Sequence, residues 1–262
     1  MTPSFADFDC FPFTAGEITK KIYRSPQNGP AVILIHELPG MIPECQRRGE
    51  WLAAQGFTVY MPLLFGQPGD NLGVKPFFLP CVRREFHLWG ADKTSPIVGF
   101  LTELAKVAHE ECGGPGVGAI GMCLTGGFGL GMMVEPSVRA PVVCQPSIPN
   151  PLLPVSQIGL SPSDLEKTST RCKKENIDVL GFRFEKDPLC PRKRFEKLEN
   201  ALGKRFVPHV IGQDGRSSPK GHSTLTLDFY QNEGFAEDEK REIEQKLVDH
   251  LDRYLRDEPA PR

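Results

Sequence analysis

One glycine-rich stretch, residues 116–128 (GVGAIGMCLTGGF), constrains the fold of this chain more than any other. A short apolar run at residues 117–120 ends in Gly121, and Cys123 follows two residues later. Small residues then lead into a second apolar run at residues 128–134. This order predicts a buried strand, a sharp turn at Cys123 and a helix. Glycines around such a turn relieve the crowding that strained backbone dihedral angles cause.

The predicted turn would present Cys123 as a reactive group. A side chain on a strand-to-helix turn projects above the end of a sheet, and the N-terminus of the following helix favours a thiolate there. The alternative is that Cys123 is a small buried side chain of the core, which is the commonest environment of a free cysteine. The stretch alone leaves both interpretations open.

Gly116, Gly118 and Gly121 also match the spacing of a dinucleotide-binding loop, G-x-G-x-x-G. In such loops the glycines follow the strand and begin the helix, whereas the first two here precede the predicted strand or lie within it. Residues 140–145, where an acidic partner for the ribose is expected, contain no Asp or Glu. We therefore reject a dinucleotide site.

Composition excludes several classes of protein. The 262 residues carry a net charge of −2 without a long run of one sign, so nothing indicates nucleic acid binding. No apolar run approaches the length of a membrane-spanning helix, and residues 1–13 lack the features of a secretory signal. The eight cysteines are scattered, without a C-x-x-C pair or a Cys/His metal spacing. This pattern predicts reduced thiols in the cytoplasm and argues against structural zinc.

Strands and helices are expected to alternate along the chain. Residues 31–35, 43–55 and 57–61 form a strand–helix–strand unit whose first strand is apolar enough to be buried on both faces. The other expected strands are 17–23 (antiparallel, at the sheet edge), 117–120, 138–144, 178–184 and 206–211, and the other helices are 94–112, 161–174 (with Ser163 as N-cap), 192–202 and 236–255. The alternation predicts one doubly wound, mostly parallel sheet, with residues 1–262 as a single domain. Residues 63–93, rich in Pro, Gly and aromatics, are expected to pass over the rim of the site.

Four polar residues follow predicted strand ends: Glu37, Cys123, Asp187 and His222. In an open parallel sheet, reactive groups collect at the carboxyl ends of the strands. The order of nucleophile, acid and histidine along the chain is that of α/β-hydrolases. Singly, Asp187 could be a solvated loop residue or a helix cap, and His222 a surface histidine. Together and in this order, they favour a catalytic site.

The other five histidines fit this role less well. His36 is expected beside the site and His209 inside the last strand, while His87, His109 and His250 are expected at the surface. Only His222 follows the last strand in a loop of small residues, where an imidazole can reach the nucleophile.

The chain resembles the dienelactone hydrolase family over about residues 17–255, nearly its whole length. The matching segments are His36-Glu37, residues 121–127 (GMCLTGG), residues 183–191 (RFEKDPLCP) and residues 221–223 (GHS). The resemblance implies an α/β-hydrolase fold with little or no separate cap domain. It also implies a triad of Cys123, Asp187 and His222, contact of Glu37 with the thiol, and an oxyanion hole formed by the amides of Leu38 and Leu124.

Two departures from the family pattern concern the turn and the substrate. Thr125 stands where the family usually has glycine, two residues after the cysteine. Well-studied members hold a substrate carboxylate with arginines, one of them shortly after the histidine, but residues 223–230 contain none. Arg83 or Arg84 could supply the other arginine, although a solvated surface pair explains them equally simply.

The sequence therefore predicts a hydrolase of a small carboxylic ester or lactone that works through a thioester, without a metal or organic cofactor. We expect a small-molecule substrate, no nucleic acid or membrane partner, and a monomer or homodimer. Glu37 is expected to hold Cys123 as a thiol until substrate enters, although it could instead cap a loop or pair with Arg47 or Arg48. The alternative function is a non-catalytic binding protein or thiol redox sensor.

Overall fold

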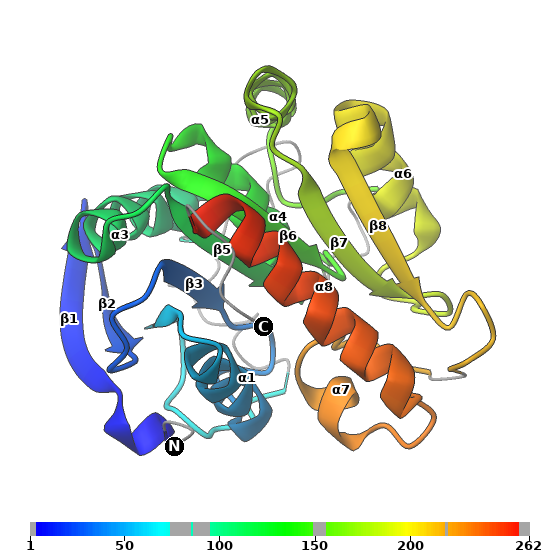
Figure 1. The fold of residues 1–262 in the computed structure, drawn as a ribbon, viewed down its shortest axis with the longest axis horizontal. Helices are drawn as coiled ribbons and strands as arrows, with labels where there is room; N and C mark the ends of the chain where they lie inside the picture. The colour runs from blue at the N-terminus through cyan, green and yellow to red at the C-terminus, as the bar shows by residue number, and fades with distance from the viewer. Residues whose placement is uncertain (1–3, 74–84, 86–94, 149–155, 218–219, 257–262) are drawn as a thin grey trace.

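The computed structural model describes residues 4–73, 85, 95–148, 156–217 and 220–256. These residues form an eight-stranded sheet in the order β1-β2-β4-β3-β5-β6-β7-β8 (Figure 1). β1 pairs with β2 and β2 with β4 in antiparallel fashion, and all other neighbours are parallel. The strands are β1 (Asp9–Ala15), β2 (Ile18–Arg24), β3 (Ala31–Ile35), β4 (Thr58–Leu63), β5 (Val117–Met122), β6 (Val138–Cys144), β7 (Val179–Phe184) and β8 (Phe206–Ile211). The predicted α/β class with a mostly parallel sheet is confirmed.

Helices cover both faces of this sheet. α1 and α8 share one face, where Arg48 of α1 forms an ion pair of 2.9 Å with Glu244 of α8. In Figure 1, α8 crosses in front of the sheet, while α4 lies behind it and contacts β5 and β6. The helices are α1 (Pro43–Ala54), α3 (Pro96–Cys112), α4 (Gly126–Gly131), α5 (Pro162–Glu175), α6 (Arg192–Leu202), α7 (Leu227–Gln231) and α8 (Glu237–Leu255). Within the described ranges, no helix combines the length and the apolar character that a membrane crossing requires.

The central strands are apolar because helices cover both of their faces. Every residue of β3 and of β5 is buried. α8 turns Leu247 and Leu251 toward the sheet, one helical turn apart, and burial stabilises each such side chain by roughly 1.5–3 kcal/mol. Gly118 allows this close approach, because a Cβ atom there would lie 2.9 Å from a methyl group of Leu251.

Three details differ from the sequence-based expectation. Residues 17–23 do form an antiparallel strand, but β1 occupies the sheet edge, where Pro12 is tolerated because one side of the strand is unpaired. Ser161 rather than Ser163 caps α5, since its hydroxyl accepts from the Asp164 amide at 3.1 Å. His250 is buried rather than exposed, because α8 turns it toward the Pro141 carbonyl, 3.1 Å from Nε2.

The carboxyl ends of the parallel strands lie along one edge of the sheet. Ile35 of β3 pairs with Gly121 of β5, and Met122 of β5 pairs with Cys144 of β6. The loops that follow β3, β5, β6, β7 and β8 therefore emerge side by side. These loops carry the residues that the sequence singled out.

Candidate active site

Cys123 occupies the turn directly after β5. Its φ of +51° lies in the left-handed region, which costs a residue other than glycine roughly 1–2 kcal/mol. Ser147 closes the turn by donating its backbone N–H to the Cys123 carbonyl at 2.9 Å. Gly121 is required, because a Cβ atom there would lie 2.2 Å from the carbonyl oxygen of Thr125. The strand, turn and helix expected around Cys123 are all present.

Thr125 fits this turn although the family pattern favours glycine at its position. Its hydroxyl accepts a hydrogen bond from the Met122 amide at 3.0 Å. The same hydroxyl lies 2.9 Å from the Met122 carbonyl and 3.2 Å from that of Ile35, and donates its single proton to one of them at a time. Thr125 thus connects the ends of β5 and β3, and the turn closes with threonine in place.

Asp187 lies in the loop after β7 and is 3% exposed. Its Oδ1 accepts from the backbone amides of Leu189 at 2.8 Å and Cys190 at 3.0 Å. The buried Arg183 side chain holds the same loop by donating to the Cys190 carbonyl at 3.2 Å. These contacts leave Asp187 Oδ2 facing His222.

His222 is fixed through both its side chain and its backbone. Nδ1 lies 2.7 Å from Asp187 Oδ2. The amides of His222 and Ser223 each donate to Asp228 Oδ2 at 2.8 Å, so the short helix α7 anchors the loop. Burial lowers the pKa of His222, but a negative charge on Cys123 and the hydrogen bond to Asp187 outweigh burial and hold the pKa well above its ordinary value.

Glu37 follows β3 by two residues and is 1% exposed. Thr226 Oγ1 donates to its Oε1, and Gln145 Nε2 donates to its Oε2 at 3.2 Å. Burial raises the pKa of Glu37, although the charge of His222 and these two hydrogen bonds oppose the rise. The carboxyl group therefore retains its proton more readily than an exposed glutamate does.

The alternative partners of Glu37 are engaged elsewhere. Arg48 pairs with Glu244, and Arg47 lies over the ring of Tyr230 at 4.3 Å from its centroid. The hydrogen bonds of Glu37 given above go to Thr226 and Gln145 instead. Glu37 thus points into the site rather than to the surface of α1.

The side chains of Cys123, His222 and Glu37 lie close together. Cys123 Sγ, one ring nitrogen of His222 and one carboxylate oxygen of Glu37 lie within 4.8 Å of one another. His222 Nε2 is buried and has no hydrogen-bond partner within the described part of the chain. Asp187 joins the cluster through Nδ1 of the same ring. Groups in this arrangement can pass a proton between sulfur, imidazole and carboxylate.

Comparison with protein families places this chain in a known group. The model of the dienelactone hydrolase family matches residues 19–213. The chain belongs to the dienelactone hydrolase family. It is an α/β-hydrolase, and membership implies a small-molecule substrate.

Solved structures share the fold of this family member at low sequence identity. A candidate dienelactone hydrolase from Klebsiella pneumoniae subsp. pneumoniae is 15% identical with a TM-score of 0.64, and the match covers 94% of this chain and 99% of that one. A puromycin hydrolase is 12% identical (TM-score 0.58; 94% of this chain, 39% of that chain). A thermostable esterase is 14% identical (TM-score 0.56; 94% and 63%). A search of curated proteins found no match.

Four further residues of this dienelactone hydrolase family member were predicted to take part in the site: Leu38, Leu124, Arg83 and Arg84. Leu38 and Leu124 directly follow Glu37 and Cys123 on the adjacent loops after β3 and β5. Their amides as oxyanion donors stay a prediction. Arg83 and Arg84 lie outside the described residues.

Sequence analysis did not identify Gln145 and Thr224 as part of the site. Gln145 follows β6 with a φ of +31°, and its backbone N–H donates to the Phe182 carbonyl at 2.7 Å. Its side-chain oxygen accepts from the Thr224 hydroxyl at 2.5 Å. Gln145 therefore ties the His222 loop to Glu37. A polar residue directly after a buried strand at the active edge was the signal available for Gln145.

His36 has a structural role. Its Nε2 accepts from the Leu64 amide at 3.0 Å, and Nδ1 lies 3.1 Å from the Glu37 carbonyl. Complete burial lowers its pKa to about 4, so the ring is neutral at physiological pH. His36 connects the ends of β3 and β4 and is not available as a base.

Arg194 adds a buried cation to the surroundings of the site. It is 6% exposed and donates to the Gln157 carbonyl from α6. Burial lowers the pKa of Arg194, and negative charges at Cys123 and Asp187 oppose this shift. The guanidinium therefore contributes positive potential near the sulfur.

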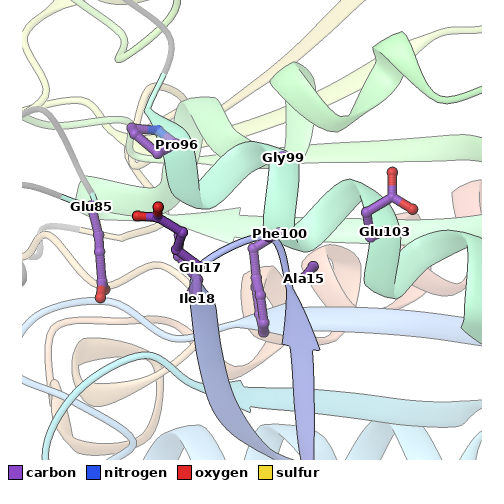
Figure 2. Close-up of a pocket in the computed structure, with 9 residues that line it drawn as sticks. Ala15, Glu17, Ile18, Glu85, Pro96, Gly99, Phe100 and Glu103 are labelled. Carbon is purple, nitrogen blue, oxygen red and sulfur yellow. The ribbon is translucent and has the colours of Figure 1, made fainter.

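A separate hollow of about 490 Å³ lies between the β1–β2 hairpin and α3 (Figure 2). Glu17, Glu85 and Glu103 line it together with the apolar ring of Phe100. Glu85 pairs with Lys20 and Glu103 with Lys106, both at 2.7 Å. None of the four clustered site residues lines this hollow.

Proposed function

We propose that this protein hydrolyses small carboxylic esters or lactones, with Cys123 as nucleophile, His222 as general base and Asp187 as the group that orients His222. One observation carries the proposal. The Cys123 sulfur, on a turn with φ of +51°, lies within 4.8 Å of a nitrogen of His222, and Nδ1 of that ring is bonded to Asp187. The order of nucleophile, base and orienting acid in this cluster supports acyl transfer as the reaction.

In the first step, the Cys123 sulfur attacks the substrate carbonyl and its proton passes to His222. The imidazolium is stabilised by Asp187, and the developing oxyanion by the proposed amides of Leu38 and Leu124. Removing a single donor from such a hole costs roughly 3–4 kcal/mol in other acyl-transfer enzymes. The alcohol leaves with the proton from His222, and a thioester remains on Cys123.

The second step follows from the electrostatics of His222. A negative charge on Cys123 is the largest of the contributions that raise the pKa of His222. Forming the thioester removes that charge, so the pKa falls and the ring becomes neutral. Neutral His222 then accepts a proton from water, which attacks the thioester and releases the acid.

Glu37 is proposed to control the resting state. Its carboxylate near the sulfur disfavours the thiolate, because like charges raise the free energy of both ionised groups. Thr226 and Gln145 hold the carboxylate in this resting position, and substrate entry would displace it from the sulfur. No metal or organic cofactor takes part in these steps.

We also propose that residues 1–262 form a single catalytic domain, active in the cytoplasm as a monomer or homodimer. Free thiols at all seven described cysteines suit a reducing compartment. Light scattering of the purified protein determines the oligomeric state.

A panel of aryl esters and lactones tests the function. We expect multiple turnovers with at least one small ester or lactone. The fraction of activity lost on alkylation should equal the fraction of Cys123 that is alkylated. If Cys123 reacts with peroxide but no member of the panel is turned over, the thiol sensor is the better account.

A further inference from the structure

We propose that the Glu37–Cys123–His222 cluster is also a binding site for Zn²⁺, which occupies the nucleophile and inhibits the enzyme. The inhibition rests on the function proposed above, whereas the binding stands on the geometry of the three side chains. No metal-ligand spacing in the sequence indicates this site, because its members come from three separate loops.

The donor set and its spacing suit zinc. A thiolate, an imidazole and a carboxylate are the three side-chain ligands that zinc prefers, and three protein ligands with one open position are typical of accessible sites. At zinc bond lengths of 2.0–2.3 Å, tetrahedral donors lie about 3.3–3.8 Å apart. The three donor atoms lie within 4.8 Å of one another, so donor atoms need to move by no more than about 1 Å to reach this spacing.

Groups behind the ligands hold them in the required state. Asp187 accepts from His222 Nδ1, so when a metal ion displaces the second proton of the ring, the lone pair lies on Nε2. Nε2 is buried and has no hydrogen-bond partner among the described residues. A carboxylate behind a ligating histidine is the usual outer partner in zinc sites, because it fixes the ring and raises its basicity.

Glu37 is held in the same way. Thr226 and Gln145 each donate to one of its oxygens. A carboxylate oxygen has two lone pairs, so each can still bind a metal. The carboxylate is therefore positioned without being saturated.

The charges also favour a dication. Cys123 thiolate and Glu37 carboxylate together offset the charge of Zn²⁺, and burial penalises Glu37 when it is ionised without a cation. Arg194 acts in the opposite direction. We therefore expect a dissociation constant on the order of micromolar rather than the far lower values of structural zinc sites.

Neighbouring cysteines do not compete for the ion. Burial raises the pKa of both Cys144 and Cys190 far above the ordinary value. A thiol must lose its proton to bind zinc, so these two are poor ligands.

Co²⁺ titrated into the full-length protein tests the site, since cobalt replaces zinc and reports thiolate ligation through a near-ultraviolet charge-transfer band. We expect the band to saturate at one equivalent and to vanish on addition of Zn²⁺. Cys123→Ser should lose the band. Asp187→Asn should weaken cobalt affinity roughly 10–100-fold through the histidine. Cys10→Ser, which changes an exposed cysteine on β1, is the matched control and should keep both band and activity.

Absence of the band, or its persistence in Cys123→Ser, overturns the site. Inhibition is measured separately with a substrate ester: free Zn²⁺ should block turnover at the concentration that displaces cobalt, and a chelator should restore it. Normal turnover in saturating zinc overturns the inhibition. If the band forms but no ester or lactone is ever hydrolysed, the site stands and only the proposed function fails.

Discussion

Cys123 and Cys144 lie at the ends of neighbouring parallel strands, yet their surroundings differ. Cys144 is the last residue of β6 and pairs with Met122, the residue before Cys123. Both cysteines are buried. Cys144 remains in the extended strand, and burial raises the pKa of its thiol far above the ordinary value. Cys123 has left its strand at a φ of +51°, which brings its sulfur to His222. Cys123 lies one residue beyond the partner of Cys144, and this single position separates a candidate nucleophile from a core residue.

Replacing the two cysteines in turn should have the most unequal effect. Cys123→Ala should reduce kcat/KM at least about a thousandfold, because triad nucleophiles in other hydrolases contribute that much or more. Cys144→Ala should keep activity within a fewfold and lower the free energy of unfolding by about 1–2 kcal/mol, since it leaves a small cavity. Ester turnover and denaturant unfolding measure the two effects. Equal activity losses would remove the distinction.

The second prediction concerns coupling between Cys123 and His222. Members of a triad are strongly non-additive. The double variant Cys123→Ala/His222→Ala should therefore be scarcely less active than Cys123→Ala alone. Residual kcat/KM values of the single and double variants provide the measurement. Multiplicative losses would show that His222 acts independently of the sulfur, for example in binding.

Glu37 provides a smaller, intermediate effect. In Glu37→Gln, iodoacetamide should alkylate the free enzyme at Cys123 up to about tenfold faster near neutral pH, because a like charge has been removed, while ester turnover slows. Thr226→Val is the matched control, since it removes one hydrogen bond to Glu37 and keeps the charge. Cys144 should resist alkylation in all variants. An alkylation profile unchanged from wild type would end the gating hypothesis.

The smallest predicted effect is a change in the titration of His222. Its pKa is raised in the folded protein, so its contribution to stability is complete below the unfolded value of about 6.5 and disappears as pH rises through the folded pKa. Cys123→Ala removes the largest raising contribution, so the His222 pKa should fall. Imidazole resonances followed by NMR against pH measure the change, with Cys144→Ala as the control. An unaltered pKa in Cys123→Ala would mean that no thiolate faces the ring in the free enzyme, which is the state in which gating by Glu37 is complete.

The sequence was most informative about site residues that lie just after a buried strand. β3 and β5 are apolar throughout and β7 is apolar except for Arg183, because both faces are covered, and the polar residues after these strands then stand out. This is why Glu37, Cys123 and Asp187 could be proposed as candidates without a structure. His222 required only that the last strand be located.

Contacts between loops could not be predicted in this way. Gln145, Thr224 and Thr226 form the network that joins Glu37 to the His222 loop, yet their separations along the chain carry no periodic signal. Helix α7 is five residues long and too short for a helical pattern. Thr125 satisfies the turn through side-chain hydrogen bonds that a comparison with glycine does not suggest.

The central claim is that the acyl group of the substrate passes through Cys123 and not through its neighbour in the sheet. Acid quenching during turnover of an aryl ester, followed by peptide mass spectrometry, tests it most directly. We expect one acyl adduct per chain, on the peptide that carries Cys123, absent from Cys123→Ala and retained in Cys144→Ala. The account would be contradicted if wild type showed full turnover without an adduct and Cys123→Ala lost no activity. An adduct on Cys144 would contradict it as well.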